Sequence, residues 1–217
     1  MVLAELGTGE PVTERARIEI LDAAAACFME RGYAATSIDD VARRLRATKG
    51  RIYHHFSSKA DLFAQIFRTG MDMNFAAIEP FRSLDEPAVD VWTKMARTHA
   101  RQMIVTRAYQ RVVWEGVEMH LRGATTPEQR SQFNELVEYR TQYSNVFRAQ
   151  LAKARDEGDM HFADLSIANQ MMFMALNSPI FWYKPRPGES MRDIDNIVEQ
   201  VVAFARGGLG GKDKEEP

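Results

Sequence analysis

Residues 36–60 read TSIDDVARRLRATKGRIYHHFSSKA, and the folding of the first part of the chain follows from this stretch. Ser37 is followed three residues later by Asp40, a spacing typical of the capping box that starts an α-helix. Apolar residues at Ile38 and Val41 then lie on one face of a two-turn helix. The pattern therefore predicts a short helix that begins after Ser37.

A second short helix follows after a tight turn. The turn lies at Arg46 and Ala47, and the next helix starts near Thr48. Ile52 and Phe56 are four residues apart on this helix, so both are expected in the core. Helix, tight turn and short helix make the geometry of a helix-turn-helix, in which the start of the second helix enters the major groove of DNA.

The same region concentrates positive charge. Residues 41–60 contain six basic residues and no acidic one. The six are Arg43, Arg44, Arg46, Lys49, Arg51 and Lys59. The whole chain has 28 Lys and Arg against 30 Asp and Glu, a net charge of -2, which taken alone argues against a nucleic-acid partner. Outside this segment 22 basic residues face 30 acidic ones, so the near-neutral total hides a basic segment on an acidic body.

The exposed start of the second helix carries the residues expected to read DNA. There the guanidinium of Arg51 can read guanine, and Gly50 leaves room for the duplex to approach closely. Tyr53, His54 and Lys59 lie where a hydroxyl, an imidazole and an ammonium group can reach phosphates. The alternative is a solvated basic face without a partner. Tyr53 and His54 favour DNA binding, because a purely structural short helix has little reason to carry them here.

The run from Ile18 to Phe67 resembles the N-terminal DNA-binding domain of TetR-family transcriptional regulators. Four motifs carry the resemblance, in this order: a helix ending in Phe-x-x-x-Gly-Tyr, a Thr-Ser helix start, Lys-Gly-x-Ile-Tyr-x-His-Phe, and Ser-Lys-x-x-Leu. The resemblance implies a homodimer that binds a palindromic operator in double-stranded DNA, usually as a repressor. The expected DNA contacts are Thr36, Ser37, Arg46, Thr48, Lys49, Gly50, Arg51, Tyr53, His54 and Lys59.

Apolar residues recur at spacings of three and four almost everywhere in the chain, and no stretch alternates as a strand would. An all-α fold of about nine helices is therefore expected. Helices are predicted from Thr13 to about Gly32, from about Lys59 towards Pro80, and near residues 86–105, 107–122, 126–157, 164–184 and 190–206. The expected domains are a flexible arm (1–12), a helix-turn-helix DNA-binding domain (13–58), an effector-binding and dimerisation domain (59–206) and a disordered tail (207–217).

The composition narrows the class of protein. With 217 residues, 45% of them hydrophobic, the chain can bury a full core. The single cysteine, Cys27, excludes an internal disulfide and a thiolate-rich zinc site, so neither a metal nor another cofactor is expected. No apolar run of about 18 residues and no charged-then-apolar leader is present, which predicts a soluble cytoplasmic protein. A Gly-x-Ser-x-Gly elbow and a phosphate-binding glycine loop are also missing, so no enzyme is expected.

The second part of the chain is rich in methionine and contains all three tryptophans, and the resemblance implies that it houses an effector. On the helix near 126–157, Arg140 falls on an apolar stripe, and its buried guanidinium needs an anionic partner. That partner is either the effector or Glu115 or Glu118. Asn177 lies in an apolar stretch and either contacts the ligand or bonds to another helix. The expected effector-binding residues are Trp92, Met95, Trp114, Glu118, Met119, Arg140, Tyr143, Phe147, Met174, Asn177 and Phe181.

The stretch from Leu176 to Glu199 is similar to the C-terminal region of TetR members that sense acyl-CoA or related thioesters. Pro179 inside the penultimate helix is expected to kink it. The last two helices carry the dimer in this family. The expected function is a ligand-responsive repressor that a small hydrophobic or CoA-thioester effector releases from its operator. The alternative is a helical acyl-thioester-binding carrier or enzyme without DNA binding.

Overall fold

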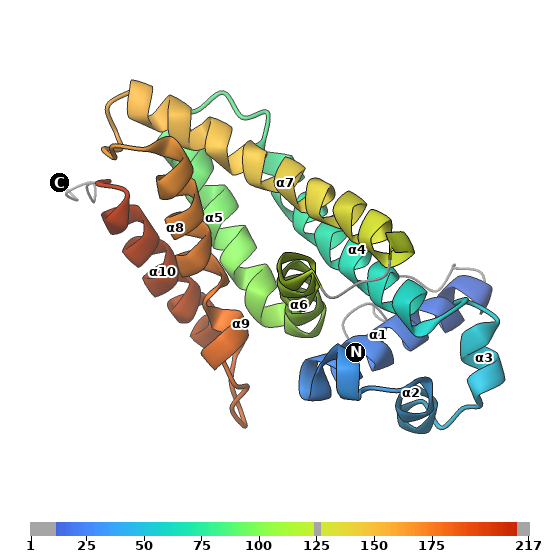
Figure 1. Ribbon diagram of the computed structural model, residues 1–217. Helices are drawn as coiled ribbons and strands as arrows, with labels where there is room; N and C mark the ends of the chain where they lie inside the picture. Colours follow the sequence, from blue (N-terminus) through green and yellow to red (C-terminus); the bar gives the residue numbers. More distant parts are fainter. Residues whose placement is uncertain (1–11, 124–126, 212–217) are drawn as a thin grey trace. The chain divides into compact units, whose positions relative to one another are not determined.

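The computed structural model describes residues 12–123 and 127–211, and within them the chain forms helices, turns and loops without a β-strand. The helices, drawn in Figure 1, are α1 (Val12–Ala35), α2 (Ile38–Arg44), α3 (Lys49–Tyr53), α4 (Lys59–Ile78), the 3-10 helix η1 (Glu79–Phe81), α5 (Ala88–Val105), α6 (Arg107–Arg122), α7 (Pro127–Asp156), α8 (Leu165–Asn177), α9 (Pro179–Trp182) and α10 (Met191–Gly208). The expected all-α class is confirmed. The described residues form ten α-helices, and because α9 is only a single turn, this agrees with the expected number of about nine. No helix in the described ranges is long and apolar enough to span a membrane.

Helix α1 is interrupted at Gly32, close to its predicted end. Gly32 has φ 78° and ψ 165°, a backbone conformation that favours glycine and breaks the regular helix before Ala35. At the other end, Thr13 lies within α1 rather than before it, because the helix already includes Val12. The predicted N-cap at Thr13 is therefore wrong, whereas the predicted stop at glycine is correct.

Side-chain caps start two of the helices at the predicted positions. At α2, the Ser37 hydroxyl oxygen accepts the Asp40 N–H at 3.2 Å, and the Asp40 carboxylate accepts the Ser37 N–H at 2.9 Å. The same reciprocal pair of bonds joins Ser190 and Asp193 at the start of α10. Each capping box satisfies N–H groups that a helix start leaves without partners.

The chain divides into two compact units, and the first comprises the residues up to Asp72 together with Thr106–Tyr139. In this unit α1 packs against both α2 and α6, and α2 packs against α3. Rings of Phe28, Tyr33 and Phe63 meet edge-on or tilted in its core. The unit is larger than the expected DNA-binding segment 13–58, because the packing of α6 on α1 and the aromatic contact of α4 with α1 extend it.

The second unit comprises Met73–Val105 and the residues from Arg140 onwards. Its helices α5, α8 and α10 lie side by side, and α9 also packs on α5. Pro179 interrupts the predicted helix 164–184: α8 ends at Asn177 and α9 begins at Pro179. The expected kink is confirmed, since proline has no N–H to continue the hydrogen-bond ladder.

The end of the second unit is more ordered than expected. Helix α10 continues through Gly207 to Gly208, and the side chain of Leu209 is buried. The Leu209 carbonyl accepts the His161 N–H at 2.9 Å, which ties the helix end to the loop before α8. The predicted disorder is therefore wrong for residues 207–211. Residues 212–217, and the predicted arm up to residue 11, lie outside the described residues.

Candidate functional site

Helix α3 shows an apolar side to the core and a polar side to solvent. Ile52 and Phe56 are buried, as their spacing predicts. Thr48, Lys49, Gly50, Tyr53 and His54 are all exposed. A Cβ at Gly50 would meet only the Thr48 hydroxyl at 3.7 Å, so this point of the surface is open. The start of α3 therefore presents a side that a DNA groove can approach.

The cations around α3 are held by carboxylates of the same unit. The Lys49 ammonium lies 2.7 Å from Asp39 on α2, and this contact raises the pKa of Lys49. The Arg51 guanidinium lies 2.6 Å from Glu19 on α1. Both pairs are partly exposed, and such pairs contribute little to stability because water competes with them. Reading DNA through Lys49 or Arg51 requires these pairs to open.

Two expected phosphate contacts, Thr36 and Lys59, have structural partners instead. The Thr36 hydroxyl is buried and donates to the Gly32 carbonyl at 2.8 Å, which contradicts a hydroxyl contact with phosphate. The Lys59 ammonium donates to the carbonyls of Tyr33 and Thr36, each at 2.9 Å, and lies over the Tyr33 ring. Lys59 therefore ties the start of α4 to the end of α1, and its predicted role as a phosphate anchor is not supported.

Ser37 and Arg46 lie at the two ends of the α2 region. Both are exposed, but the Ser37 hydroxyl also donates to Asp40 at 2.6 Å and is engaged in the capping box. Bonds from Ser37 hold the pKa of the Asp40 carboxyl well below its usual range. Arg46 has φ 52°, the left-handed conformation of the tight turn between α2 and α3. Contacts of these two residues with DNA stay a prediction.

In the second unit, a buried histidine joins several of the expected effector residues. His99 on α5 lies 2.9 Å from the Tyr143 hydroxyl through Nδ1 and 2.9 Å from Asn177 Oδ1 through Nε2. Burial lowers the pKa of His99 to about 4, so the ring is neutral near pH 7. Because Asn177 Oδ1 is an acceptor, Nε2 carries the proton and Nδ1 accepts from Tyr143.

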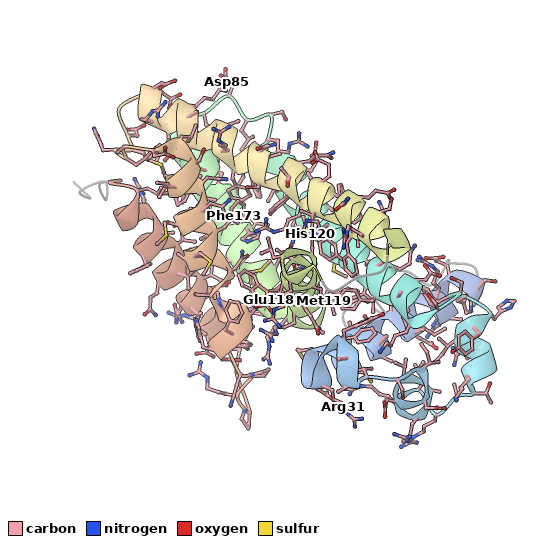
Figure 2. All side chains as sticks on the ribbon, in the orientation of Figure 1. Arg31, Asp85, Glu118, Met119, His120 and Phe173 are labelled. Carbon is pink, nitrogen blue, oxygen red and sulfur yellow. The ribbon has the colours of Figure 1, made fainter. Side chains whose placement is uncertain are left out.

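Aromatic side chains surround this histidine. The rings of Phe147 on α7 and Phe173 on α8 both pack against His99. Figure 2 shows Phe173 on the side of α8 that faces α5 and α7. Trp92 and Met95 on α5 are fully buried, and the Trp92 N–H donates to the Met172 sulfur at 3.1 Å. The interhelical hydrogen bond was the alternative for Asn177, and the structure contains it.

The expected effector residues do not all gather in one place. Trp114, Glu118 and Met119 belong to the first unit, and Figure 2 shows the last two on α6. The other eight belong to the second unit. There Met174 and Phe181 are about half exposed on the outward side of α8 and α9, away from the buried side chains around His99. Their contact with an effector stays a prediction. Helical periodicity explains Met174, because its neighbour Phe173 takes the inward position.

Arg140 lies on the stripe of α7 where the spacing places it, with Leu136 and Tyr143 buried on either side. Burial lowers the pKa of its guanidinium. The two expected partners have other bonds within the first unit. Glu115 accepts the Tyr33 N–H at 2.6 Å, and Glu118 lies 3.9 Å from Arg122. The predicted internal salt bridge is therefore not supported.

Two family models match this chain. One, described as bacterial regulatory proteins of the tetR family, matches residues 20–66. The other, described as the tetracyclin repressor-like C-terminal domain, matches residues 85–209, which is more than half of the chain. The chain belongs to the TetR family.

Relatives along nearly the whole chain agree with this TetR assignment. The HTH-type transcriptional repressor KstR2 of Rhodococcus jostii is 25% identical over 89% of this chain and 90% of its own length. The HTH-type transcriptional activator FasR of Mycolicibacterium smegmatis is 27% identical over 94% of this chain and 86% of its own. These relatives are regulators rather than enzymes. The protein is thus a DNA-binding transcription regulator, as the sequence predicts.

Solved structures share the TetR fold. The ketosteroid transcriptional regulator KstR2 of Mycobacterium tuberculosis superposes with a TM-score of 0.76 at 23% identity, covering 94% of this chain and 98% of that one. The regulator PfmR of Thermus thermophilus has a TM-score of 0.68 at 27% identity, with 90% and 99% of the two chains covered. The architecture is therefore common to regulators of several bacteria.

Sequence reasoning missed His99 and the carboxylates that hold the α3 cations. His99 lies on the apolar stripe of α5 with Trp92, Met95 and Met103. The position of a histidine on an apolar stripe is the sequence signal that could have identified it. Glu19 gave no comparable signal, because it is 32 residues from Arg51 in the chain. Only the packing of α3 near α1 brings their charges together.

Proposed function

We propose that this TetR-family regulator is a repressor that binds a palindromic operator as a homodimer and leaves it when a small effector binds. The observation that carries the proposal is the exposed side of α3. Lys49, Gly50 and Tyr53 face solvent there, while buried Ile52 fixes the helix on its unit. In a helix-turn-helix this helix enters the major groove, and phosphate contacts set its register.

The outward face of α8, α9 and α10 supports the proposed dimer. Its exposed apolar side chains are Ile167, Met171, Met174, Phe181, Trp182, Met191 and Phe204. A groove of about 930 Å³ runs among Met171, Trp182 and Phe204. Exposed apolar surface of this extent marks an interaction site, and a two-fold dimer covers it with the same face of a second copy.

The proposed effector is a hydrophobic molecule or a CoA thioester that binds within the second unit. The names of two structural relatives support this class: KstR2 of Mycobacterium tuberculosis is called a ketosteroid transcriptional regulator, and a protein of Clostridium perfringens is called a putative fatty acid metabolism regulator. The aromatic side chains around His99 supply an apolar environment of the right kind. Effector and operator are then linked by a reciprocal coupling free energy.

Fluorescence anisotropy with labelled DNA from upstream of the protein's own gene tests the proposal. Saturable binding at low salt, with two chains per symmetric site, is the expected result. Addition of an acyl-CoA or a steroid-derived CoA thioester is expected to release the DNA. Tighter binding on addition would contradict the repressor mechanism and favour an activator, the role named for the relative FasR. Failure to bind any such fragment would contradict operator binding itself.

A further inference from the structure

A polar pocket of about 290 Å³ lies between α7 and α8 in the second unit. Its lining includes the cations Arg140 and Arg148 and the polar residues Ser144, Ser166 and Asn169, with no acidic side chain. We propose that this pocket binds an oxyanion, the carboxylate or phosphate group of a small molecule. The inference rests on the proposed function only where it assigns that group to the effector.

Arg140 is the first reason to expect an anion. Its side chain stands on the apolar stripe of α7 and is only partly accessible, and burial lowers the pKa of the guanidinium. No described carboxylate of the second unit makes a salt bridge with it. Removing a guanidinium from water is unfavourable unless an anion pairs with it. The open side of the pocket is where an anionic partner can reach it.

Asn169 is an independent second reason. It is only 4% exposed and lines the pocket, and its Nδ2 donates to the Ser144 hydroxyl oxygen at 2.8 Å. Its Oδ1 is buried without a hydrogen-bond partner. A half-turn of the amide lets Ser144 donate to Oδ1 and puts the N–H₂ group in the unpartnered position, where it can donate to an anion. A buried polar group without a partner is rare in a folded protein unless something else binds it.

Arg148 completes the positive side of the pocket. It lies two turns beyond Arg140 on α7, and its guanidinium donates to the Ser166 hydroxyl oxygen at 3.3 Å on α8. Ser166 follows Asp164, which caps α8. Two guanidinium groups with amide and hydroxyl donors are the groups that recognise carboxylate and phosphate. The volume suits one such group rather than a complete apolar ligand.

Isothermal titration calorimetry of the full chain tests the inference with three probes: inorganic phosphate, free coenzyme A and decanoate. Phosphate and coenzyme A report a phosphate source, and decanoate reports a carboxylate. At least one probe is expected to bind with a Kd of about 1 mM or tighter. Arg140→Met is expected to weaken that probe about tenfold or more, and Arg140→Lys to keep part of the affinity.

The matched control is Arg155→Met, because Arg155 lies on the same helix but pairs with Asp156 and does not line the pocket. The Arg155→Met chain is expected to bind the probe with the same affinity as the unchanged chain. If Arg140→Met fails to fold, as judged by its thermal melt, Ser144→Ala decides, and an affinity equal to that of the unchanged chain overturns the inference. Binding of none of the probes, or equal binding by Arg140→Met and the control, also overturns it.

Operator binding is measured on the same samples to separate the two proposals. If the chain binds DNA but none of the probes, only the proposal of the anion site is refuted. If the chain binds a probe but no DNA, the repressor proposal is refuted and the proposal of the anion site is supported. The control Arg155→Met is expected to bind operator with unchanged affinity, since Arg155 lines neither the pocket nor the exposed side of α3.

Discussion

The Arg51 guanidinium lies 2.6 Å from the Glu19 carboxylate, so the side chain expected to read guanine is paired with α1 when no DNA is present. Both side chains are about 40% exposed. An exposed pair of this kind contributes at most about 1 kcal/mol, so DNA can open it at a small cost. The pair keeps Arg51 oriented near α3 while weakening every DNA complex that must open it.

Replacing Glu19 with Gln is expected to tighten operator binding roughly two- to fivefold, because Arg51 is then free to reach the bases. The control is Glu14→Gln, which makes the same charge change on the same helix beside Arg17. Anisotropy titrations of both variants on one operator measure the difference. Equal gains from the two variants would mean that only net charge matters and would refute a specific role for the pair.

A charge placed at Phe204 is expected to break the proposed dimer. Phe204 is 77% exposed on α10, and Phe204→Glu would put a carboxylate into both halves of a two-fold interface. The dimer is expected to weaken by about a hundredfold. Leu121→Glu is the control, since Leu121 is 78% exposed on α6. Sedimentation equilibrium distinguishes the two, and a dimer that survives Phe204→Glu would place the interface elsewhere.

Gly116 on α6 is expected to tolerate no side chain. A Cβ there would lie 2.7 Å from Cδ2 of the buried Phe67 ring, so Gly116→Ala forces the packing of α6 against α4 apart. The free energy of unfolding is expected to fall by about 1–3 kcal/mol. Gly207→Ala in α10 meets nothing within 4 Å and is expected to raise it by about 0.5–1 kcal/mol. Urea unfolding measures both, and an unharmed Gly116→Ala would contradict the described packing.

The buried His99 is expected to make the protein less stable in mild acid. Its pKa is about 4 in the folded chain and about 6.5 when unfolded, so between these values only the unfolded chain takes up the proton. The contribution of the neutral His99 ring to the free energy of unfolding is constant above about pH 6.5. It is lost as the pH falls towards 4. Between pH 7 and pH 5, the free energy of unfolding is expected to fall by about 2 kcal/mol more in the unchanged chain than in His99→Gln. A His99→Gln chain with the same pH dependence would contradict this.

The helix boundaries were largely predictable from the sequence, because the signals that set them are local. Ser37 with Asp40, and Ser190 with the carboxylate three residues on, mark helix starts through bonds within one turn. Pro179 breaks a helix through its own missing N–H. Leu209 shows the limit of such reasoning. A glycine-rich segment predicts disorder, yet one buried leucine and a bond to the loop before α8 hold it in place.

The roles of charged side chains were less predictable, because distant partners decide them. Lys59 fits a phosphate anchor by its position in a motif, but the carbonyls at the end of α1 take its ammonium. Thr36 is buried by the same junction. Only part of the proposed anion pocket could be predicted from the sequence. Periodicity places Arg140 on the apolar stripe, but Asn169 joins Arg140 only through the packing of α8 on α7. Residue type and spacing therefore locate candidates, and tertiary contacts assign their roles.

The salt dependence of operator binding tests the central claim, that α3 is the DNA-reading helix, most directly. Lys49→Ala removes about one phosphate contact per chain, so the slope of log K against log salt is expected to become shallower by about 1.8 for the dimer. Arg122→Ala, an exposed cation on α6, is the control and is expected to leave the slope unchanged. A slope that is the same for Lys49→Ala and the unchanged chain would contradict the claim.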